Sequence, residues 1–532
     1  MVTSLMITDT ADHPSESPVV APAWTMPSTI LRPAATFATT ASPFRFQLSA
    51  GTIVGGPHTD ASLAIPVRAT VLCGGGARGR HSSNEILGGM SRVTPLSGFP
   101  EWSPSERIVE ASVIATLREV FALHGFAEIE TRAVEPVGRL TGESDAAKEI
   151  YALSRLKAEE PSDARLGLHF DLTVPFARYV EEFAPSLAFP FRRYQIQKVW
   201  RGERPQEGRY REFYQADIDI VARDVLPSHL EAEVAVVMAR ALAALPIPRA
   251  TMHINNRRLV EGFYRAVGVE DVPGALRSVD KLDKLGSDGV RKELAIKGVS
   301  STAQDAVLEL AKIHSRDSSF IGAIDDLWQT SFITGDAEAE KLFADGVAEL
   351  AALVNAVNAA VPGTAVADLR IARGLDYYTG AVYETVLEGH EDLGSICSGG
   401  RYDSLVAGGG FPGVGLSIGV SRLLSRVLGA GLARASRAVP SAVLVAVTDE
   451  DTRGSSNAVA DSLRARGIPC EVAPSAAKFG KQIQHAERRG IPFVWFPDAG
   501  EVKDIRSGEQ ATADAATWEP PAEDRWPRTV PA

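Results

Sequence analysis

Apolar residues recur at helical spacing in several stretches of the chain after residue 90. Residues 104–124 show this spacing and stop before Gly125, a residue suited to the position just after a helix. Similar spacing in 226–245 and through most of 250–361 predicts further amphipathic helices. The 250–361 block carries no catalytic constellation, so we expect it to be a helical insertion.

Alternating apolar and polar positions predict strands in two other segments. Residues 199–219 begin apolar, become strongly charged, and close on alternating apolar and acidic positions. This pattern fits a strand, a basic loop and a returning strand. Residues 367–385 alternate like two strands about a glycine-containing turn. From about 440, short apolar strands alternate with helical segments, which predicts a small α/β domain with a mainly parallel sheet.

The first 90 residues differ from the rest, since they are rich in Ser, Thr, Ala, Pro and Gly, contain no lysine and show no sustained period. Such a segment buries too little apolar area to offset the entropy of ordering. We therefore expect a disordered tail, and we hypothesise a native start at Met90, which N-terminal sequencing would test. The expected parts are the tail at 1–90, a large domain at 91–435 with its insertion at about 250–361, a small domain at 440–515, and a loose tail at 516–532.

Composition narrows the class of protein. The chain has 532 residues, of which 45% are hydrophobic and 23% charged, which is ordinary for a soluble protein of roughly three domains. Cys73, Cys397 and Cys470 are too few and scattered for a disulfide framework or metal cluster, which favours a cytoplasmic location. No apolar run approaches the ~20 residues of a membrane span. The net charge of -12 argues against indiscriminate nucleic-acid binding but allows a local basic surface.

The basic loop is the first candidate for chemistry. It carries Arg201, Arg204, Arg209 and Arg211, and guanidinium groups match phosphate oxygens two at a time. A solvated hairpin tip explains the same residues without any function. The loop alone therefore leaves both interpretations open.

Three further groups of residues have both a functional and a structural interpretation. Asp171 and Thr173 face one side if they lie in a strand, but they also suit the start of a helix. Arg373 lies near tyrosines and Asp376, where it either meets an anion or belongs to a closed ion-pair network. Arg422 falls on the first turn of a helix that follows a glycine-rich strand, from which it could reach an anion.

Three separated segments resemble one enzyme family. The segment 200–220, WRGERPQEGRYREFYQADIDI, resembles motif 2 of the class II aminoacyl-tRNA synthetases, and 413–424, GVGLSIGVSRLL, is similar to their motif 3. The segment 370–384, RIARGLDYYTGAVYE, resembles a block found in the histidyl-tRNA synthetases. The resemblance extends from about Met90 to about Gln510. It implies an α+β catalytic domain with an antiparallel sheet flanked by helices, followed by an anticodon-binding domain at 440–515.

The resemblance also implies a reaction and its residues. L-histidine would be activated with ATP and Mg²⁺ to histidyl-adenylate, and histidine would then pass to the 3′ end of tRNA(His). The implied catalytic residues are Arg201 and Arg373, and no residue is implied as a metal ligand. Histidine would be bound by Asp171, Leu172, Thr173, Arg201, Gln215, Asp219, Arg373, Tyr377 and Tyr378. ATP would be bound by Arg201, Glu203, Arg209, Phe213 and Arg422, and the tRNA acceptor end by Arg204 and Gln206.

This chemistry explains why no Ser, Cys or His triad is found. The attacking carboxylate is already ionised, and fixed guanidinium groups stabilise the charge that grows on the phosphoryl oxygens. The family also implies a homodimer in the cytoplasm, with no membrane partner. Its first motif commonly has a proline where this chain has Thr131 and Arg132, so the dimer expectation is less direct.

Two non-catalytic interpretations compete with an enzyme. One is a histidine-binding regulatory subunit of ATP phosphoribosyltransferase, which typically lacks the C-terminal domain and has a degraded RGLDYYTG block. The other is an RNA-binding or sensor protein with an inactive synthetase domain. The intact block and the three arginines Arg201, Arg373 and Arg422 argue against both.

Overall fold

The computed structural model describes residues 94–141, 148–155, 165–331, 333–371, 378–404, 406 and 409–531. The expected tail at 1–90 and the hypothetical start at Met90 lie outside the described residues. All structural statements below concern the described part of the chain.

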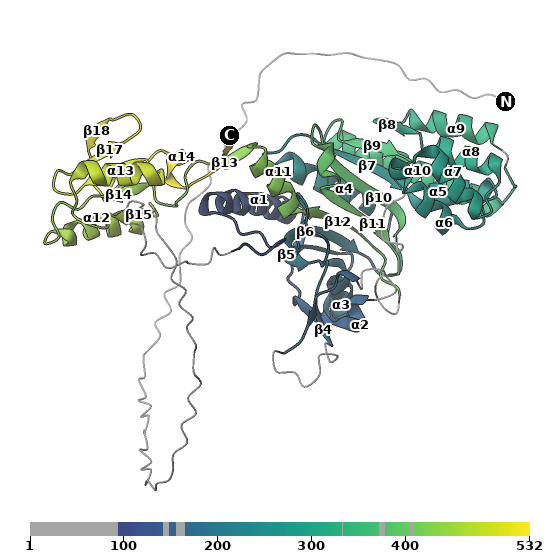
Figure 1. The fold of residues 1–532 in the computed structure, drawn as a ribbon, viewed down its shortest axis with the longest axis horizontal. Helices are drawn as coiled ribbons and strands as arrows, with labels where there is room; N and C mark the ends of the chain where they lie inside the picture. Colours follow the sequence, from purple (N-terminus) through teal and green to yellow (C-terminus); the bar gives the residue numbers. More distant parts are fainter. Residues whose placement is uncertain are drawn as a thin grey trace, which may run out of the picture. The chain divides into compact units, whose positions relative to one another are not determined.

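A large sheet forms the centre of the first domain (Figure 1). Nine described strands follow the order β1-β5-β6-β12-β11-β10-β7-β9-β8. Neighbours are antiparallel except at β1–β5 and β7–β9, so the sheet is mixed and antiparallel pairs predominate. The strands are β1 (Ala127–Glu128), β5 (Phe191–Trp200), β6 (Glu212–Val221), β7 (Ala250–Asn256), β8 (His314–Ser315), β9 (Ala365–Asp368), β10 (Tyr378–Leu387), β11 (Cys397–Tyr402) and β12 (Gly413–Gly419).

The predicted strand, basic loop and returning strand are confirmed as β5, residues 201–211 and β6. The two strands pair from Phe191 opposite Val221 to Trp200 opposite Glu212. Near its tip the loop closes on itself, because the Gln206 N–H donates to the Arg209 carbonyl at 3.1 Å and the Arg209 N–H donates back at 2.9 Å. Gly208 takes φ 69° in this turn, a conformation that glycine adopts without steric cost. The arginines of the loop are therefore held by a defined backbone.

Helices α1 (Pro104–Leu123), α4 (His229–Ala243) and α11 (Val420–Gly429) pack against strands of the large sheet. A capping box starts α1, with Glu106 N–H donating to the Ser103 hydroxyl and the Ser103 N–H donating to the Glu106 carboxylate. The apolar residues that predict α1 are those that it buries, including Val113, Leu117 and Phe121. The helices predicted at 104–124 and 226–245 are thus confirmed with slightly shorter bounds.

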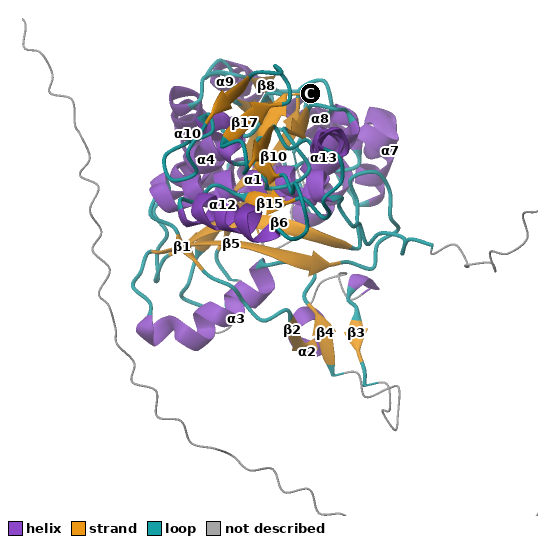
Figure 2. Ribbon diagram, turned by 90° about the vertical axis from the view of Figure 1, so that its left-hand side faces the viewer, coloured by secondary structure: helices purple, strands orange, loops and turns teal. Residues whose placement is uncertain are grey.

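A smaller three-stranded sheet lies ahead of the basic loop in the chain. It consists of β2 (Val134–Pro136), β4 (Leu166–Leu168) and β3 (Ala152–Leu153), with the short helix α2 (Val137–Thr141) beside it (Figure 2). After β4 the chain enters helix α3 (Thr173–Phe183) and the 3₁₀ turn η3 (Ala184–Ser186). This path brings Asp171 to the start of α3.

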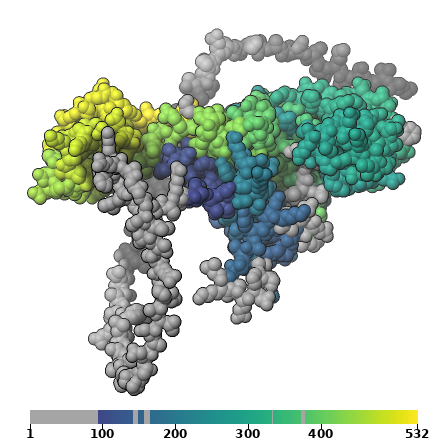
Figure 3. Space-filling model, viewed as in Figure 1, coloured from purple at the N-terminus to yellow at the C-terminus, as the bar shows by residue number. Residues whose placement is uncertain are grey.

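Six described helices lie between β7 and β9 in sequence and form the insertion, coloured teal in Figure 3. The expected start near residue 250 is too early, because 250–256 form β7 and bury Met252 and Ile254 in the core. Gly262 and Gly346 let α5 and α10 approach closely, since a Cβ at either would lie 2.4 or 2.3 Å from a backbone nitrogen of the other helix. The helices are α5 (Arg257–Ala266), α6 (Val272–Val279), α7 (Leu282–Ile296), α8 (Ser301–Leu310), α9 (Phe320–Thr330) and α10 (Ala337–Ala360).

Helix α10 is the one helix in the described chain that is long and apolar enough to cross a membrane by composition. It buries several large apolar side chains inside the domain, among them Leu350, Val354 and Val357. The helix packs on α5, α4 and the sheet strands β7 and β9. Core packing therefore accounts for its composition.

The C-terminal domain contains a five-stranded sheet with helices α12 (Arg453–Ala465) and α13 (Phe479–Arg489). Strand β14 (Val443–Val445) pairs in parallel with β15 (Cys470–Val472) and β16 (Phe493–Phe496). Strands β17 (Glu501–Asp504) and β18 (Gln510–Thr512) then add antiparallel pairs. The sheet is therefore mixed, and the expectation of a mainly parallel sheet is not confirmed. The loops from β16 to β17 and from β17 to β18 are too short for a parallel crossover. Both strands are also too polar to show the apolar pattern from which strands were predicted.

The segment expected as a loose tail at 516–532 forms specific contacts. Strand β19 (Thr529–Pro531) pairs antiparallel with β13 (Ala433–Ala435), and the short helix α14 (Ala522–Arg525) precedes it. The Trp518 ring lies 5.3 Å from Phe493 and 5.6 Å from Trp495, in edge-on geometry. Large aromatic side chains bury much apolar area, which offsets the entropy of ordering this segment.

Candidate active site

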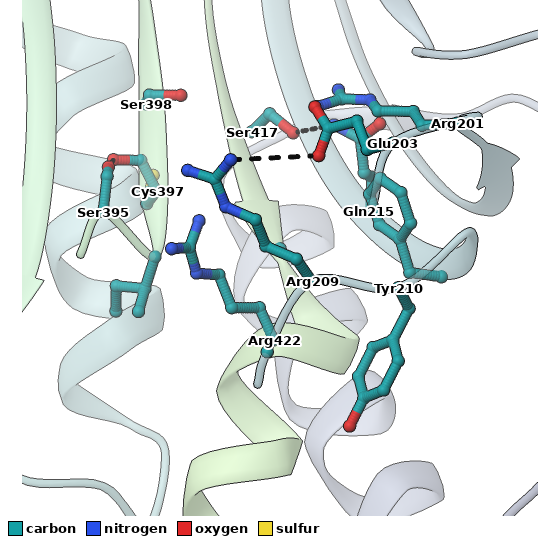
Figure 4. A pocket seen from close by; sticks show the side chains of 14 residues that line it. Arg201, Glu203, Arg209, Tyr210, Gln215, Ser395, Cys397, Ser398, Ser417 and Arg422 are labelled. Atoms are coloured by element: carbon teal, nitrogen blue, oxygen red, sulfur yellow. Dashed lines mark hydrogen bonds and ion pairs between the residues drawn. The ribbon is translucent and has the colours of Figure 1, made fainter. Parts of the chain in front are cut away.

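A pocket of about 210 Å³ lies where the basic loop meets β6, β11, β12 and the start of α11 (Figure 4). The loop contributes Arg201, Glu203, Arg209 and Tyr210, and α11 contributes Arg422. The strands contribute Phe213, Gln215, Cys397, Ser398 and Ser417, and Ser395 and Ile396 come from the turn before β11. We call this the cationic pocket, because three arginines line it.

Arg201 is fixed at one side of the cationic pocket. Its Nε donates to the Phe170 carbonyl at 2.9 Å, and its guanidinium carbon lies 5.2 Å from the centre of the Phe213 ring. Its backbone N–H donates to the Arg211 carbonyl at 2.9 Å. A guanidinium held in this way can stabilise developing negative charge without first having to reorganise.

Arg209 and Arg422 point into the same part of the cationic pocket (Figure 4). Arg209 lies 3.9 Å from Glu203, while Arg422 donates through Nη2 to the Leu393 carbonyl. Burial, and then the positive charge of Arg209, lower the pKa of Arg422. No described residue accepts a hydrogen bond from the buried Nε of Arg422. Two neighbouring cations with spare donors suit a polyanion.

A second, smaller pocket of about 30 Å³ adjoins the cationic pocket and shares Ser398 and Ser417 with it. We call it the acidic pocket, because Asp217 and Asp219 line it together with Thr173, Tyr378 and Tyr402. Glycines at 399, 400 and 415 form part of its wall. A Cβ at Gly415 would lie 2.0 Å from an Asp219 oxygen, so only glycine leaves room for this carboxylate.

Asp219 is held by a buried ion pair. Its Oδ2 lies 2.6 Å from Arg193 Nη2, and its Oδ1 accepts from the Tyr402 hydroxyl at 2.8 Å. Arg193 is 0% exposed and lies 4.3 Å from the centre of the Phe176 ring. Burial raises the pKa of Asp219, against the opposing effects of Arg193 and Tyr402. Such a pair fixes its members but is costly to break.

Asp171 lies at the start of helix α3 rather than in a strand, which supports the structural interpretation of its sequence. Its Oδ1 accepts from the Val174 N–H at 3.2 Å, as a residue at a helix start does. Burial raises its pKa to about 6, while that hydrogen bond and the charges of Arg201 and Arg193 oppose the rise. Asp171 is therefore a helix-capping residue that also lies within the field of the arginines of the site.

Comparison with known proteins identifies the family. A family model described as histidyl-tRNA synthetase matches residues 98–423, and an anticodon binding domain model matches 441–512. The chain is 55% identical to a histidine–tRNA ligase of Cutibacterium acnes over 83% of this chain and 99% of that protein. It is 56% identical to one of Micrococcus luteus over 83% of this chain and all of that protein. The chain belongs to the histidyl-tRNA synthetase family.

Solved structures share the fold. The crystal structure of histidyl-tRNA synthetase from Nostoc sp. PCC 7120 matches with a TM-score of 0.69 and 35% identity, covering 79% of this chain and 96% of that one. A structure from Bacillus halodurans C, described as an ATP phosphoribosyltransferase regulatory subunit/histidyl-tRNA synthetase, matches with a TM-score of 0.59. At 20% identity over 76% of this chain and 98% of that one, the second match shows only a common fold.

The structure brings together most of the residues that the family resemblance implies. All five implied ATP residues and Gln215 line the cationic pocket, while Thr173, Asp219 and Tyr378 line the acidic pocket. Asp171 lines neither pocket, and the Leu172 side chain is buried in the core. Arg204 and Gln206 are exposed in the loop, outside both pockets. Arg373 and Tyr377 lie outside the described residues.

Sequence reasoning missed several residues of the site. Asp217 lies between Gln215 and Asp219 on β6, so strand alternation alone places all three on one face. Ser417 could also have been predicted from the sequence, because it lies at the centre of the segment that resembles motif 3. Arg193 lies on β5 but ahead of residue 199, where the predicted strand, loop and strand segment began. Tyr402 and Ser398 come from β11, whose glycine-rich sequence gives no periodic signal.

Proposed function

We propose that this chain is a histidine–tRNA ligase. It activates L-histidine with ATP to histidyl-adenylate and pyrophosphate, then transfers histidine to the 3′ end of tRNA(His). The observation that carries this proposal is the meeting of two adjoining pockets of opposite character. One is lined by Arg201, Arg209 and Arg422, and the other by buried carboxyl groups.

ATP would occupy the cationic pocket. Arg209 and Arg422 would bind the terminal phosphates, which would relieve the repulsion between their guanidinium groups. Phe213 would stack on adenine, Glu203 would accept from its amino group, and Arg201 would meet the α-phosphate. Mg²⁺ would enter bound to the phosphates as part of the substrate. In the described residues, no group of three His, Cys, Asp or Glu side chains is arranged to hold a metal.

Histidine would bind with its ring in the acidic pocket. Its α-ammonium group would face Thr173, Gln215 and the carboxyl of Asp171. Its ring would face Asp219 and Tyr378. Its α-carboxylate would then point toward the cationic pocket, where Arg201 shields the charges of both reactants.

In the first step, a carboxylate oxygen of histidine attacks the α-phosphorus and the bond to pyrophosphate breaks. The nucleophile carries no proton, so no general base is needed. Charge grows on the phosphoryl oxygens, and positioned guanidinium groups stabilise it. We propose that Arg201 and Arg373 share this role.

In the second step, a ribose hydroxyl of the terminal adenosine of tRNA(His) attacks the acyl carbon and releases AMP. The exposed Arg204 and Gln206 would contact the acceptor end, and the domain at 440–515 would bind the anticodon. We further propose a homodimer that acts in the cytoplasm. Analytical ultracentrifugation would test the dimer.

Histidine-dependent exchange of pyrophosphate into ATP, followed by charging of purified tRNA(His), tests the proposed function. We expect exchange with histidine and ATP alone, and charging when tRNA is added. No exchange at saturating histidine and ATP would overturn the proposal and favour the histidine-binding regulatory subunit. Exchange without charging would contradict the second step only.

A further inference from the structure

Asp217 is a buried carboxyl group of the acidic pocket that the implied set of histidine-binding residues does not include. It is 2% exposed, and no described residue hydrogen-bonds its Oδ1. Asp219, by contrast, already has a partner at each oxygen. A buried acceptor without a donor is costly, and a ligand that donates a hydrogen bond removes this cost.

The acidic pocket lacks enough positive charge for its carboxyl groups. Asp171, Asp217 and Asp219 influence one another. The fully buried guanidinium of Arg193 counters all three, and Arg201 also counters Asp171. Burial raises the pKa of Asp217 to about 7, and Arg193 and a hydrogen bond from Ser417 only partly oppose the rise. The acidic pocket therefore favours taking up positive charge. The groups that face Asp217 are Asp171 before α3, Arg193 on β5, Asp219 on β6, Tyr378 on β10, Cys397 and Tyr402 on β11, and Ser417 on β12.

The spacing of the two strand carboxylates suits a particular ligand. Asp217 and Asp219 are two residues apart on β6, which separates their attachment points by about 7 Å. A five-membered ring with opposed N–H groups, each making a hydrogen bond of about 2.9 Å, covers a similar distance. Only an imidazolium offers an N–H at both ring nitrogens. Neutral imidazole offers one donor and one acceptor.

We propose that Asp217 is a specificity-determining residue that, with Asp219, holds the histidine ring as an imidazolium. This rests on the proposed function, because it assumes that histidine fills the acidic pocket. Each carboxylate accepts a hydrogen bond from one ring nitrogen. When Asp217 starts protonated, its O–H bond breaks and a ring N–H bond forms, so binding needs no proton from water.

The proton balance gives histidine binding a defined pH dependence. Above about pH 7 neither Asp217 nor the free ring holds the proton, so binding takes one from water, and affinity falls roughly tenfold per pH unit. Below about pH 6 both hold a proton, so binding releases one, and affinity falls again. Affinity is therefore greatest between these limits.

Nitrogen NMR of ring-labelled L-histidine bound to the full chain at pH 8 tests the proposal. We expect both ring nitrogens to be protonated in the wild-type complex and only one in Asp217→Asn. One unprotonated nitrogen in the wild-type complex would overturn the proposal, and this outcome does not depend on any variant folding. If labelled histidine does not bind at all, the proposed function itself fails.

A kinetic comparison adds a readout that a merely structural role would not change. Asp217→Asn should raise KM for histidine roughly 10- to 100-fold at pH 7, with a smaller change in kcat, and should remove the bell-shaped pH profile of kcat/KM. Glu231→Gln is the matched control. Glu231 is another buried carboxyl, but it pairs with Arg401 and accepts from the Ala381 N–H outside both pockets. An unchanged profile in Asp217→Asn, or the same change in Glu231→Gln, would contradict the role of Asp217.

A histidine analogue whose ring is a 1,2,4-triazole tests the same idea in the wild-type protein. This ring has nearly the shape of imidazole but is far less basic, so it stays neutral near pH 7. We expect kcat/KM for the analogue to be roughly 10- to 100-fold lower than for histidine, with a smaller ratio in Asp217→Asn. Equal use of both substrates by the wild-type protein would contradict a requirement for an imidazolium.

Discussion

The two adjoining pockets of the site carry opposite charge. The cationic pocket has a spare guanidinium donor at Arg422 Nε, whereas the acidic pocket has a spare acceptor at Asp217 Oδ1. In each pocket the proposed substrate would supply the missing hydrogen-bond partner. Ser398 and Ser417 line both pockets, and in the proposed function the reacting carboxylate and phosphate would meet there. The comparison shows that unpaired polar atoms can indicate whether a pocket favours an anionic or a cationic ligand.

Removing the fixed guanidinium of the cationic pocket should have the largest effect. We expect Arg201→Ala to lower kcat for pyrophosphate exchange by roughly 10³-fold, because charge on the α-phosphoryl group loses its positioned partner. Arg204→Ala is the matched control, since Arg204 belongs to the same loop but is exposed. It should change exchange less than about threefold while weakening tRNA charging. Similar losses of exchange in both variants would mean that the loop acts only through its general charge.

Breaking the buried pair of the acidic pocket should affect both activity and stability. Asp219→Asn leaves Arg193 buried without its counter-charge, which costs about 3 to 5 kcal/mol of unfolding free energy. We expect a clear fall in Tm and a roughly 100-fold loss of kcat/KM for histidine. Thermal unfolding and exchange kinetics measure the two effects. A variant with unchanged Tm would show that Arg193 finds another partner.

Arg422 should separate ATP binding from protein stability. Because burial and Arg209 disfavour its charge in the free protein, Arg422→Gln should leave Tm unchanged or raise it by a few degrees. The same change should raise KM for ATP roughly 10- to 100-fold, since a charged hydrogen-bond partner of the phosphates is lost. A large fall in Tm would instead assign Arg422 a structural role.

The acidic pocket should also make the free protein less stable as pH rises. Burial raises the pKa of Asp171 to about 6 and of Asp217 to about 7, above the unfolded value of about 3.9. The folded state therefore binds more protons between about pH 4 and 7, so these groups lower the unfolding free energy as pH rises through that window. We expect Asp217→Asn to gain stability relative to wild type between pH 5 and 7.5 in urea unfolding. A constant difference across this range would contradict the raised pKa.

Much of this architecture could be predicted from the sequence because it depends on local periodicity. The spacing of apolar and polar residues predicts helix α1 and the β5–β6 hairpin. The motifs placed Arg201, Arg209 and Arg422 in one site. Residues that act through tertiary pairing could not be predicted. Tyr402 comes from β11, and only the sheet order brings it to Asp219. Arg193 faces Asp219 across the β5–β6 hairpin, but it precedes the segment whose pattern was recognised. The polar strands β17 and β18 depend on pairing with β16 rather than on their own pattern.

A crystal structure with a non-reactive sulfamoyl analogue of histidyl-adenylate would test both pockets at once. We expect the sulfamoyl group, which stands in for the α-phosphate, near Arg201, and the adenine ring against Phe213. The imidazole ring should lie within hydrogen-bonding distance of Asp217 and Asp219. An analogue bound elsewhere, or with its ring outside the acidic pocket, would contradict the assignment of the two pockets to ATP and histidine.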